Sequence, residues 1–237
     1  MPMDLPDSLD DIHAKAIPYD FPFDALIYCL MSQCSLDEHK NYFKRWSKIF
    51  ADLDSICAKE MKLFEFKRAV FDTNSNKYET YNFEHDMPDI SAVYRYNFDM
   101  EQIKIRAHNR NSISCSVELL NEIAWYTDKQ SHDILIDLPI FLFPYHVEIS
   151  DSNVSDYLVV DGNKRLCYAL KNNIQYIDAI IFDDVQRSDF ITSIDWAMFT
   201  CMNDAVKLRS QDVHISWSDT GILNSSKFNA ELKHLLS

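Results

Sequence analysis

One strand-to-helix turn holds the residues of this chain that are best placed to bind an anion. The segment 161–165 (Asp-Gly-Asn-Lys-Arg) follows the apolar run 157–160, and its Gly162 is one of only two glycines in 237 residues. Glycine suits such a turn because, without a Cβ, it tolerates positive φ and the close approach of another group. The first amides of the following helix have no partner within the helix and carry partial positive charge. Together with Lys164 and Arg165 they could hold a phosphate; the alternative is an ordinary turn with two solvated cations.

Hydrophobic periodicity predicts the elements that would position this turn. A strand is expected at 157–160, a helix from Gly162 to about Asn172, and a strand at 177–182. Asn173 is expected to take the left-handed conformation that ends a helix. Upstream, the unbroken apolar run 138–143 indicates a strand buried on both faces.

Further elements are expected on the N-terminal side of that run. Residues 92–98 and 102–106 are predicted as strands, and a helix should carry Val117, Leu120, Ile123 and Ala124 on one face. The order strand, helix, strand, strand, helix, strand is typical of an α+β fold.

Helical patterns surround this part of the chain. Apolar residues recur at helical spacing in 23–31, in 43–57 and again in 190–205, and Ser225-Ser226 can cap a short last helix. Segment 62–83 is ambiguous. Phe64 and Phe66 alternate as in a strand, and residues 77–83 could pair with that strand to form a hairpin. We therefore expect a mainly helical N-terminal region (1–90), an α/β core (91–183) and a helical C-terminal cap (184–237).

Composition narrows the function classes. Hydrophobic content of 47% indicates a folded protein, and the net charge of −14, from 37 acidic and 23 basic residues, argues against a protein that coats duplex nucleic acid. Such acidity could attract a basic protein partner, although an ordinary acidic surface is the commoner explanation. No apolar run is long enough to span a bilayer, and the acidic start 1–7 is unlike a signal peptide, so we expect a cytoplasmic protein without a membrane partner.

No second motif competes with the turn at Gly162. The six cysteines form no C-x-x-C pair and are expected as buried thiols, and the eight histidines show no H-E-x-x-H or H-x-H spacing. Acidic pairs such as Asp183-Asp184 could bind Mg²⁺, but exposed loop acids explain them as well, so no metal ligand is assigned.

The stretch from Gln102 to Asp183 resembles the ParB/sulfiredoxin-like superfamily. The resemblance is strongest in 159–170 (Val-Val-Asp-Gly-Asn-Lys-Arg-Leu-Cys-Tyr-Ala-Leu), followed by the apolar strand at 179–182. In that family a strand ends in a glycine-led box of the kind D-G-N-H-R, a short helix follows and an apolar strand returns. The resemblance implies a mixed-sheet α+β core, with helical additions at both ends, and a pocket at the start of the box helix that binds nucleotide phosphates.

The resemblance also assigns residues to that pocket. Gly162, Asn163, Lys164 and Arg165 match the phosphate-binding box, and Asp161 precedes it. Asn109 and Arg110 match, more loosely, the Asn or Arg that the family tends to carry after its first strand.

Three departures from the family narrow the function. Asn163 stands where sulfiredoxin needs its reactive cysteine, which argues against that chemistry. Lys164 replaces the common histidine, so a cation is kept but an acid-base group near neutral pH is lost. The tail from residue 184 on is net acidic, without an evident recognition helix, which disfavours DNA binding of the partition type.

Three functions remain open from the sequence. The first is a protein that binds a nucleotide of the ATP or CTP type and hydrolyses it or transfers a phosphoryl group with Mg²⁺. Its catalytic candidates are Asp161, Lys164 and Arg165, and Asp183 is a second candidate metal or acid-base group. The second is a non-enzymatic interaction or inhibitor protein, such as an immunity or antitoxin-like partner from a mobile element, that keeps the fold. The third, a nuclease, follows from the family analogy alone.

Overall fold

The computed structural model describes residues 21–72, 78–120, 137–150 and 153–210. The chain forms two compact units, one made of Met1–Asp99 with Phe190–Ser237 and the other of Met100–Asp189. Helices and a mixed sheet occur together, which confirms the predicted α+β class. Within the described ranges, no helix is long and apolar enough to cross a membrane.

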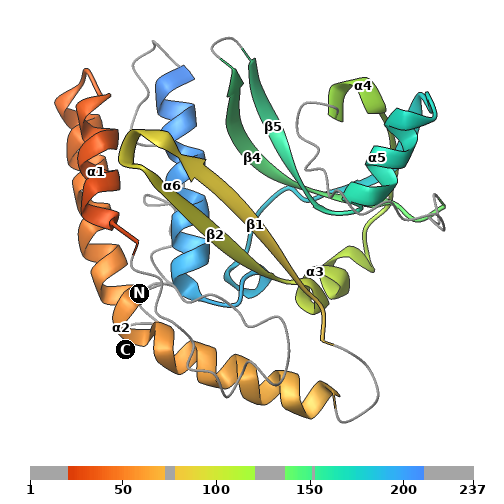
Figure 1. Ribbon diagram of the computed structural model, residues 1–237, viewed down its shortest axis with the longest axis horizontal. Helices are drawn as coiled ribbons and strands as arrows, with labels where there is room; N and C mark the ends of the chain where they lie inside the picture. The colour runs from red at the N-terminus through yellow and green to blue at the C-terminus, as the bar shows by residue number, and fades with distance from the viewer. Residues whose placement is uncertain (1–20, 73–77, 121–136, 151–152, 211–237) are drawn as a thin grey trace. The chain divides into compact units, whose positions relative to one another are not determined.

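The first unit combines long helices with a two-stranded hairpin. Its helices are α1 (Phe23–Ser32), α2 (Asp37–Asp72) and α6 (Ser193–Ser210). The antiparallel strands β1 (Thr80–Met87) and β2 (Ala92–Asp99) are joined by the short helix η2 (Pro88–Ile90), and α2 packs against both α1 and α6 (Figure 1). The helix predicted in 190–205 is confirmed as α6, but its burial is not limited to the predicted apolar face, because every residue from Ser193 to Ala205 is buried.

The strand expected around Phe64 and Phe66 is wrong, because α2 continues without a break to Asp72. Phe64 is buried together with Cys57 and Met61, seven and three residues before it, whereas Phe66 is 66% exposed. This spacing follows one face of a helix, so the short alternation was misleading. β1 pairs with β2 instead, from Thr80 opposite Asp99 to Met87 opposite Ala92.

The second unit is built on a four-stranded mixed sheet. Its strands are β3 (Ile113–Ser116), β4 (Ile140–Ser150), β5 (Asn153–Asp161) and β6 (Tyr176–Ile181), in the order β3-β6-β4-β5. β6 and β4 are parallel, whereas β3 pairs with β6, and β5 with β4, in antiparallel fashion. The helices are α3 (Met100–Ala107), α4 (Val117–Leu120), α5 (Asn163–Lys171) and the short η4 (Arg187–Asp189), and α4 contacts α5 (Figure 1).

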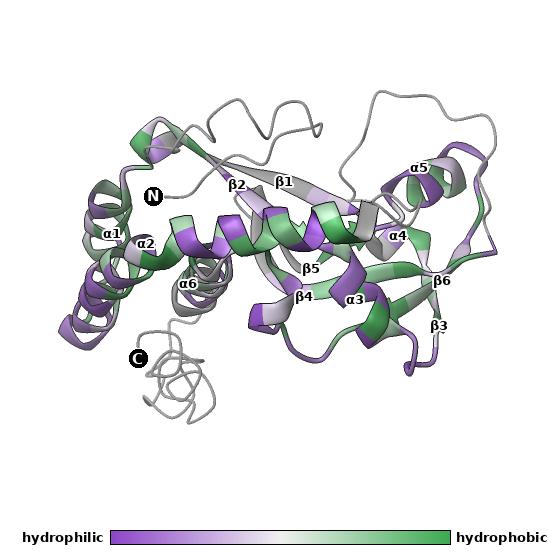
Figure 2. Ribbon diagram, turned by 90° about the horizontal axis from the view of Figure 1, so that it is seen from below, coloured by the Kyte–Doolittle hydropathy of each residue, from purple (hydrophilic) through white to green (hydrophobic). Residues whose placement is uncertain are grey.

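The apolar faces of the sheet and of α5 form the core of this unit. The cluster is made of Val117, Ile140, Leu142, Val159, Leu166, Ala169, Ile177 and Ala179. Burial of each Val, Leu or Ile side chain in this cluster contributes about 1.5–3 kcal/mol relative to exposure. Strands β4 and β6 are largely hydrophobic in Figure 2, whereas α5 shows both kinds of residue, as expected for a helix with one face on a core. The predicted strands at 138–143, 157–160 and 177–182, and the helix after Gly162, are confirmed.

The strand predicted at 102–106 is wrong, because these residues lie in α3. Met100, Ile103 and Ala107 are buried at spacings of three and four, whereas Ile105 is 63% exposed. The alternation of Ile103 and Ile105 favoured a strand, but the helical period of the longer segment decided the structure. The sheet strand in this region is β3, which the sequence did not indicate. The helix expected to carry Val117 begins there as α4, and its part beyond residue 120 lies outside the described residues, as does the segment after Ser225.

Candidate functional site

Gly162 adopts a backbone conformation that requires glycine. It is the residue before α5 and lies in the left-handed region, with φ 95° and ψ 15°. A Cβ at this position would overlap Cγ2 of Ile140 and lie 3.0 Å from Nη2 of Arg165. The turn therefore brings the start of α5 into close contact with β4, as glycine alone permits.

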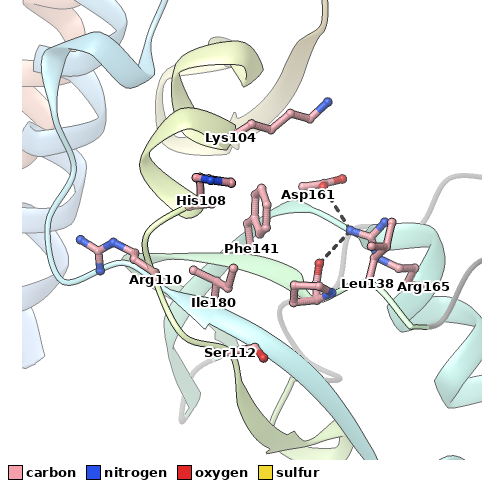
Figure 3. A pocket seen from close by; sticks show the side chains of 11 residues that line it. Lys104, His108, Arg110, Ser112, Leu138, Phe141, Asp161, Arg165 and Ile180 are labelled. Atoms are coloured by element: carbon pink, nitrogen blue, oxygen red, sulfur yellow. Dashed lines mark hydrogen bonds and ion pairs between the residues drawn. The ribbon is translucent and has the colours of Figure 1, made fainter.

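A pocket of about 400 Å³ lies beside this turn, within the second unit (Figure 3). It is formed by α3 and the segment after it, by the start of β4, by the end of β5, by β6 and by the first turn of α5. Its lining residues are Lys104, Ala107, His108, Arg110, Ser112, Leu138, Pro139, Phe141, Asp161, Arg165 and Ile180. This volume falls in the range of small-molecule sites.

Arg165 is held at one end of the pocket by two contacts. Its Nη2 donates hydrogen bonds to the carbonyl oxygen of Pro139 at 3.0 Å and to Oδ2 of Asp161 at 3.1 Å (Figure 3). The side chain is 15% exposed, and its buried Nε has no hydrogen-bond partner in the described part of the chain. The guanidinium is therefore fixed in orientation at the pocket wall.

Arg110 is held at the opposite end. Its Nη1 donates to the carbonyl oxygen of Ile181 at 3.1 Å and to Asp183 at 3.3 Å, and its guanidinium lies 4.9 Å from the centre of the Phe182 ring. Phe182 is fully buried and packs edge-on against Phe143. Nη2 of Arg110 also lies 3.8 Å from Oδ1 of Asp184; Asp183 is 89% and Asp184 41% exposed, so solvent weakens both pairings of Arg110.

A buried ion cluster fixes α3, which supplies Lys104 and His108 to the pocket. Arg106 pairs with Asp189 and also donates to Asp184 Oδ1 at 2.6 Å. Asp189 has no exposed surface and accepts a hydrogen bond from the backbone N–H of Gln186 at 2.7 Å. Burial raises the pKa of the Asp189 carboxyl above its ordinary value, although Arg106 and the Gln186 N–H act in the opposite direction.

The structure brings together some of the predicted site residues and separates others. Asp161, Arg165 and Arg110 line the pocket. Lys164 and Asn109 are exposed, and Asn163 is buried with its Nδ2 3.5 Å from the Val159 carbonyl oxygen; none of these three lines the pocket.

Sequence reasoning missed Lys104 and His108. The two residues are four apart, on α3 and just after it, and both line the pocket; in Figure 3 Lys104 lies above Phe141 and His108 lies beside it. If 100–107 had been interpreted as a helix, Lys104 and His108 would have been placed on the same face. The strand prediction instead placed Lys104 on the same face as Arg106.

The arrangement suits an anion with an apolar portion. Lys104, Arg110 and Arg165 face one lining carboxylate, that of Asp161, in a chain whose net charge is −14. Phe141, Leu138 and Ile180 provide an apolar surface, and in Figure 3 Phe141 and Ile180 lie between Arg110 and Arg165. The described residues include no group of three His, Cys, Asp or Glu side chains able to hold a metal ion.

Comparison with family models, with curated proteins and with solved structures finds no match to this chain.

Proposed function

We propose that this chain is a cytoplasmic ParB/sulfiredoxin-like protein that binds the phosphate groups of a nucleotide in the pocket beside Gly162. The observation that carries the proposal is the convergence of Lys104, Arg110 and Arg165 on one pocket of an acidic protein. Guanidinium groups match phosphate oxygens in geometry and remain charged at every physiological pH. An apolar surface next to the cations gives a nucleoside a place to pack.

The contribution of each residue follows from its contacts. Arg165 binds phosphate oxygens at the start of α5, where the helix dipole also favours negative charge. Arg110 and Lys104 neutralise further phosphate charge across the pocket. Gly162 allows the start of α5 to approach β4, which brings Arg165 to the pocket wall.

Hydrolysis or transfer of a phosphoryl group would need more than these cations. Mg²⁺ usually keeps several waters and takes one or two protein carboxylates together with phosphate oxygens. Asp161 is the carboxylate among the lining residues that could serve in this way. His108, also at the pocket, is a candidate for moving a proton during the reaction.

Replacing Lys164 and Arg165, the neighbouring cations after Gly162, should have unequal effects on nucleotide binding. Because Arg165 lines the pocket and Lys164 does not, we expect Arg165→Ala to weaken ATP or CTP binding about tenfold to a hundredfold and Lys164→Ala less than about threefold. Isothermal titration calorimetry of both variants with each nucleotide, with and without Mg²⁺, measures this difference. Unchanged affinity in a folded Arg165→Ala protein contradicts the assignment, whereas equal losses would place the phosphate outside the pocket, at the exposed start of α5.

A further inference from the structure

Asp161 is already paired with Arg165, the cation that a phosphate in this pocket would bind. Its Oδ2 accepts a hydrogen bond from Nη2 of Arg165 at 3.1 Å, and the two residues, four apart, lie on either side of Gly162. The Asp161 side chain is 34% exposed, and both residues line the pocket. The carboxylate therefore stands where an incoming anion would approach the guanidinium (Figure 3).

The pairing has a consequence for any anion that reaches Arg165. A ligand oxygen bound to the same guanidinium lies next to the Asp161 carboxylate, and two negative charges at such a distance repel one another. The ligand must displace the Asp161 carboxylate, or it binds less tightly because of this repulsion. Nη2 is also held by the Pro139 carbonyl, so Arg165 cannot easily turn away from Asp161 to meet the ligand elsewhere.

We infer that Asp161 competes with phosphate for Arg165 and thereby limits the affinity of the pocket for anions; this inference rests on the proposed function. Asp161 is a specificity-determining residue in this account. A ligand with several phosphate groups, which also reaches Lys104 and Arg110, overcomes the competition, whereas a single phosphate at Arg165 does not. The pocket accordingly selects nucleoside di- and triphosphates over monophosphates.

The substitution Asp161→Asn tests this inference. Asparagine has nearly the same shape, and its carbonyl oxygen can still accept the hydrogen bond from Arg165, but the negative charge is gone. We expect the dissociation constant for inorganic tripolyphosphate, measured by isothermal titration calorimetry, to fall about three- to tenfold, in line with one partly exposed charge interaction. Asp178→Asn removes the same charge from an exposed position on β6 outside the pocket and should change the constant less than twofold.

The outcomes separate the inference from the proposed function. Tighter binding by Asp161→Asn, or binding by this variant alone, supports the inference. Equal or weaker binding by a folded Asp161→Asn protein, with the wild type binding, overturns the inference and leaves the proposed function standing. Absence of binding by both folded proteins overturns both. Asp161→Ser makes the same charge change and replaces Asp161→Asn if that variant does not fold.

Discussion

Replacement of Arg106 by alanine is expected to destabilise the protein by about 3–5 kcal/mol at pH 7, the largest loss among the changes considered. The reason is that Asp189 has no exposed surface and would be left as a buried carboxylate without its cation. The substitution also removes the hydrogen bonds to Asp184 and the contact of the guanidinium with the Phe182 ring, 5.0 Å from its centre. Urea denaturation followed by circular dichroism gives the free energy of unfolding.

The pH dependence of this loss has a definite sign. The pKa of Asp189 is raised in the folded protein, so the contribution of this group to stability is complete below the ordinary carboxyl value of 3.8 and is lost as pH rises through the folded pKa. Without Arg106 the folded pKa rises further, because the guanidinium lowers it in the wild type. The destabilisation by Arg106→Ala should therefore be smallest near pH 4 and grow towards pH 7.

Two matched variants control for this effect. Arg106→Lys keeps a charge near Asp189 and should cost less than Arg106→Ala, and Lys171→Ala removes an exposed cation from the end of α5 and should change stability by less than about 0.5 kcal/mol. A loss of less than 1 kcal/mol for Arg106→Ala, or a loss that does not change with pH, would contradict the role assigned to this cluster.

Gly162→Ala is expected to reduce stability by about 2–4 kcal/mol and to weaken anion binding at the same time. Part of the cost comes from forcing alanine into a left-handed backbone conformation, and the rest from the overlap of its Cβ with Ile140. The same Cβ would lie 3.0 Å from Nη2 of Arg165, so the guanidinium must shift. Denaturation gives the stability, and calorimetry with ATP gives the affinity.

A double-mutant cycle with Ile140→Ala separates the two costs. Ile140→Ala removes Cγ2, the nearer of the two Ile140 atoms that overlap the new Cβ, but keeps Cβ of residue 140, which would lie 2.9 Å away; Gly162→Ala should therefore cost about 1 kcal/mol less in that background. Equal costs in both backgrounds would contradict a contribution from the overlap with Cγ2 of Ile140.

The sequence predicted the half of the second unit that follows residue 138. The predicted parts of β4, β5 and β6 are short apolar runs beside polar segments, although β4 and β5 extend well beyond them, and the one glycine of the region marks the turn into α5. Asn173 has the predicted left-handed conformation, with φ 55°. In each of these places the local pattern and the tertiary environment favour the same structure.

The region before residue 117 was predicted less well, because its local patterns compete. Ile103 and Ile105 alternate like a strand, but Met100, Ile103 and Ala107 are the residues that pack. β3 is a four-residue edge strand whose first two side chains are exposed, so its sequence carries almost no hydrophobic signal. The error at α3 also hid the contribution of Lys104 and His108, since a wrong period places side chains on the wrong face.

The candidate site could be predicted only in part for the same reason. Arg165 and Asp161 lie at the turn that the sequence indicated as an anion site, and Arg110 was predicted from the family resemblance. That Lys164 is exposed while Arg165 faces the pocket depends on the direction in which α5 leaves the turn. The sequence motif contains both Lys164 and Arg165 but does not indicate which of them faces the pocket.

The most direct test of nucleotide binding is a thermal-shift screen of the wild-type protein against ATP, ADP, CTP and GTP, each with and without Mg²⁺. A ligand that binds only the native state must raise its apparent stability, by about 2.7 kcal/mol at a concentration one hundred times the dissociation constant. We predict a clear rise in melting temperature with at least one nucleoside di- or triphosphate, and loss of that rise in Arg165→Ala. A flat result across the whole panel would contradict the account and favour an interaction protein that keeps the fold without a nucleotide.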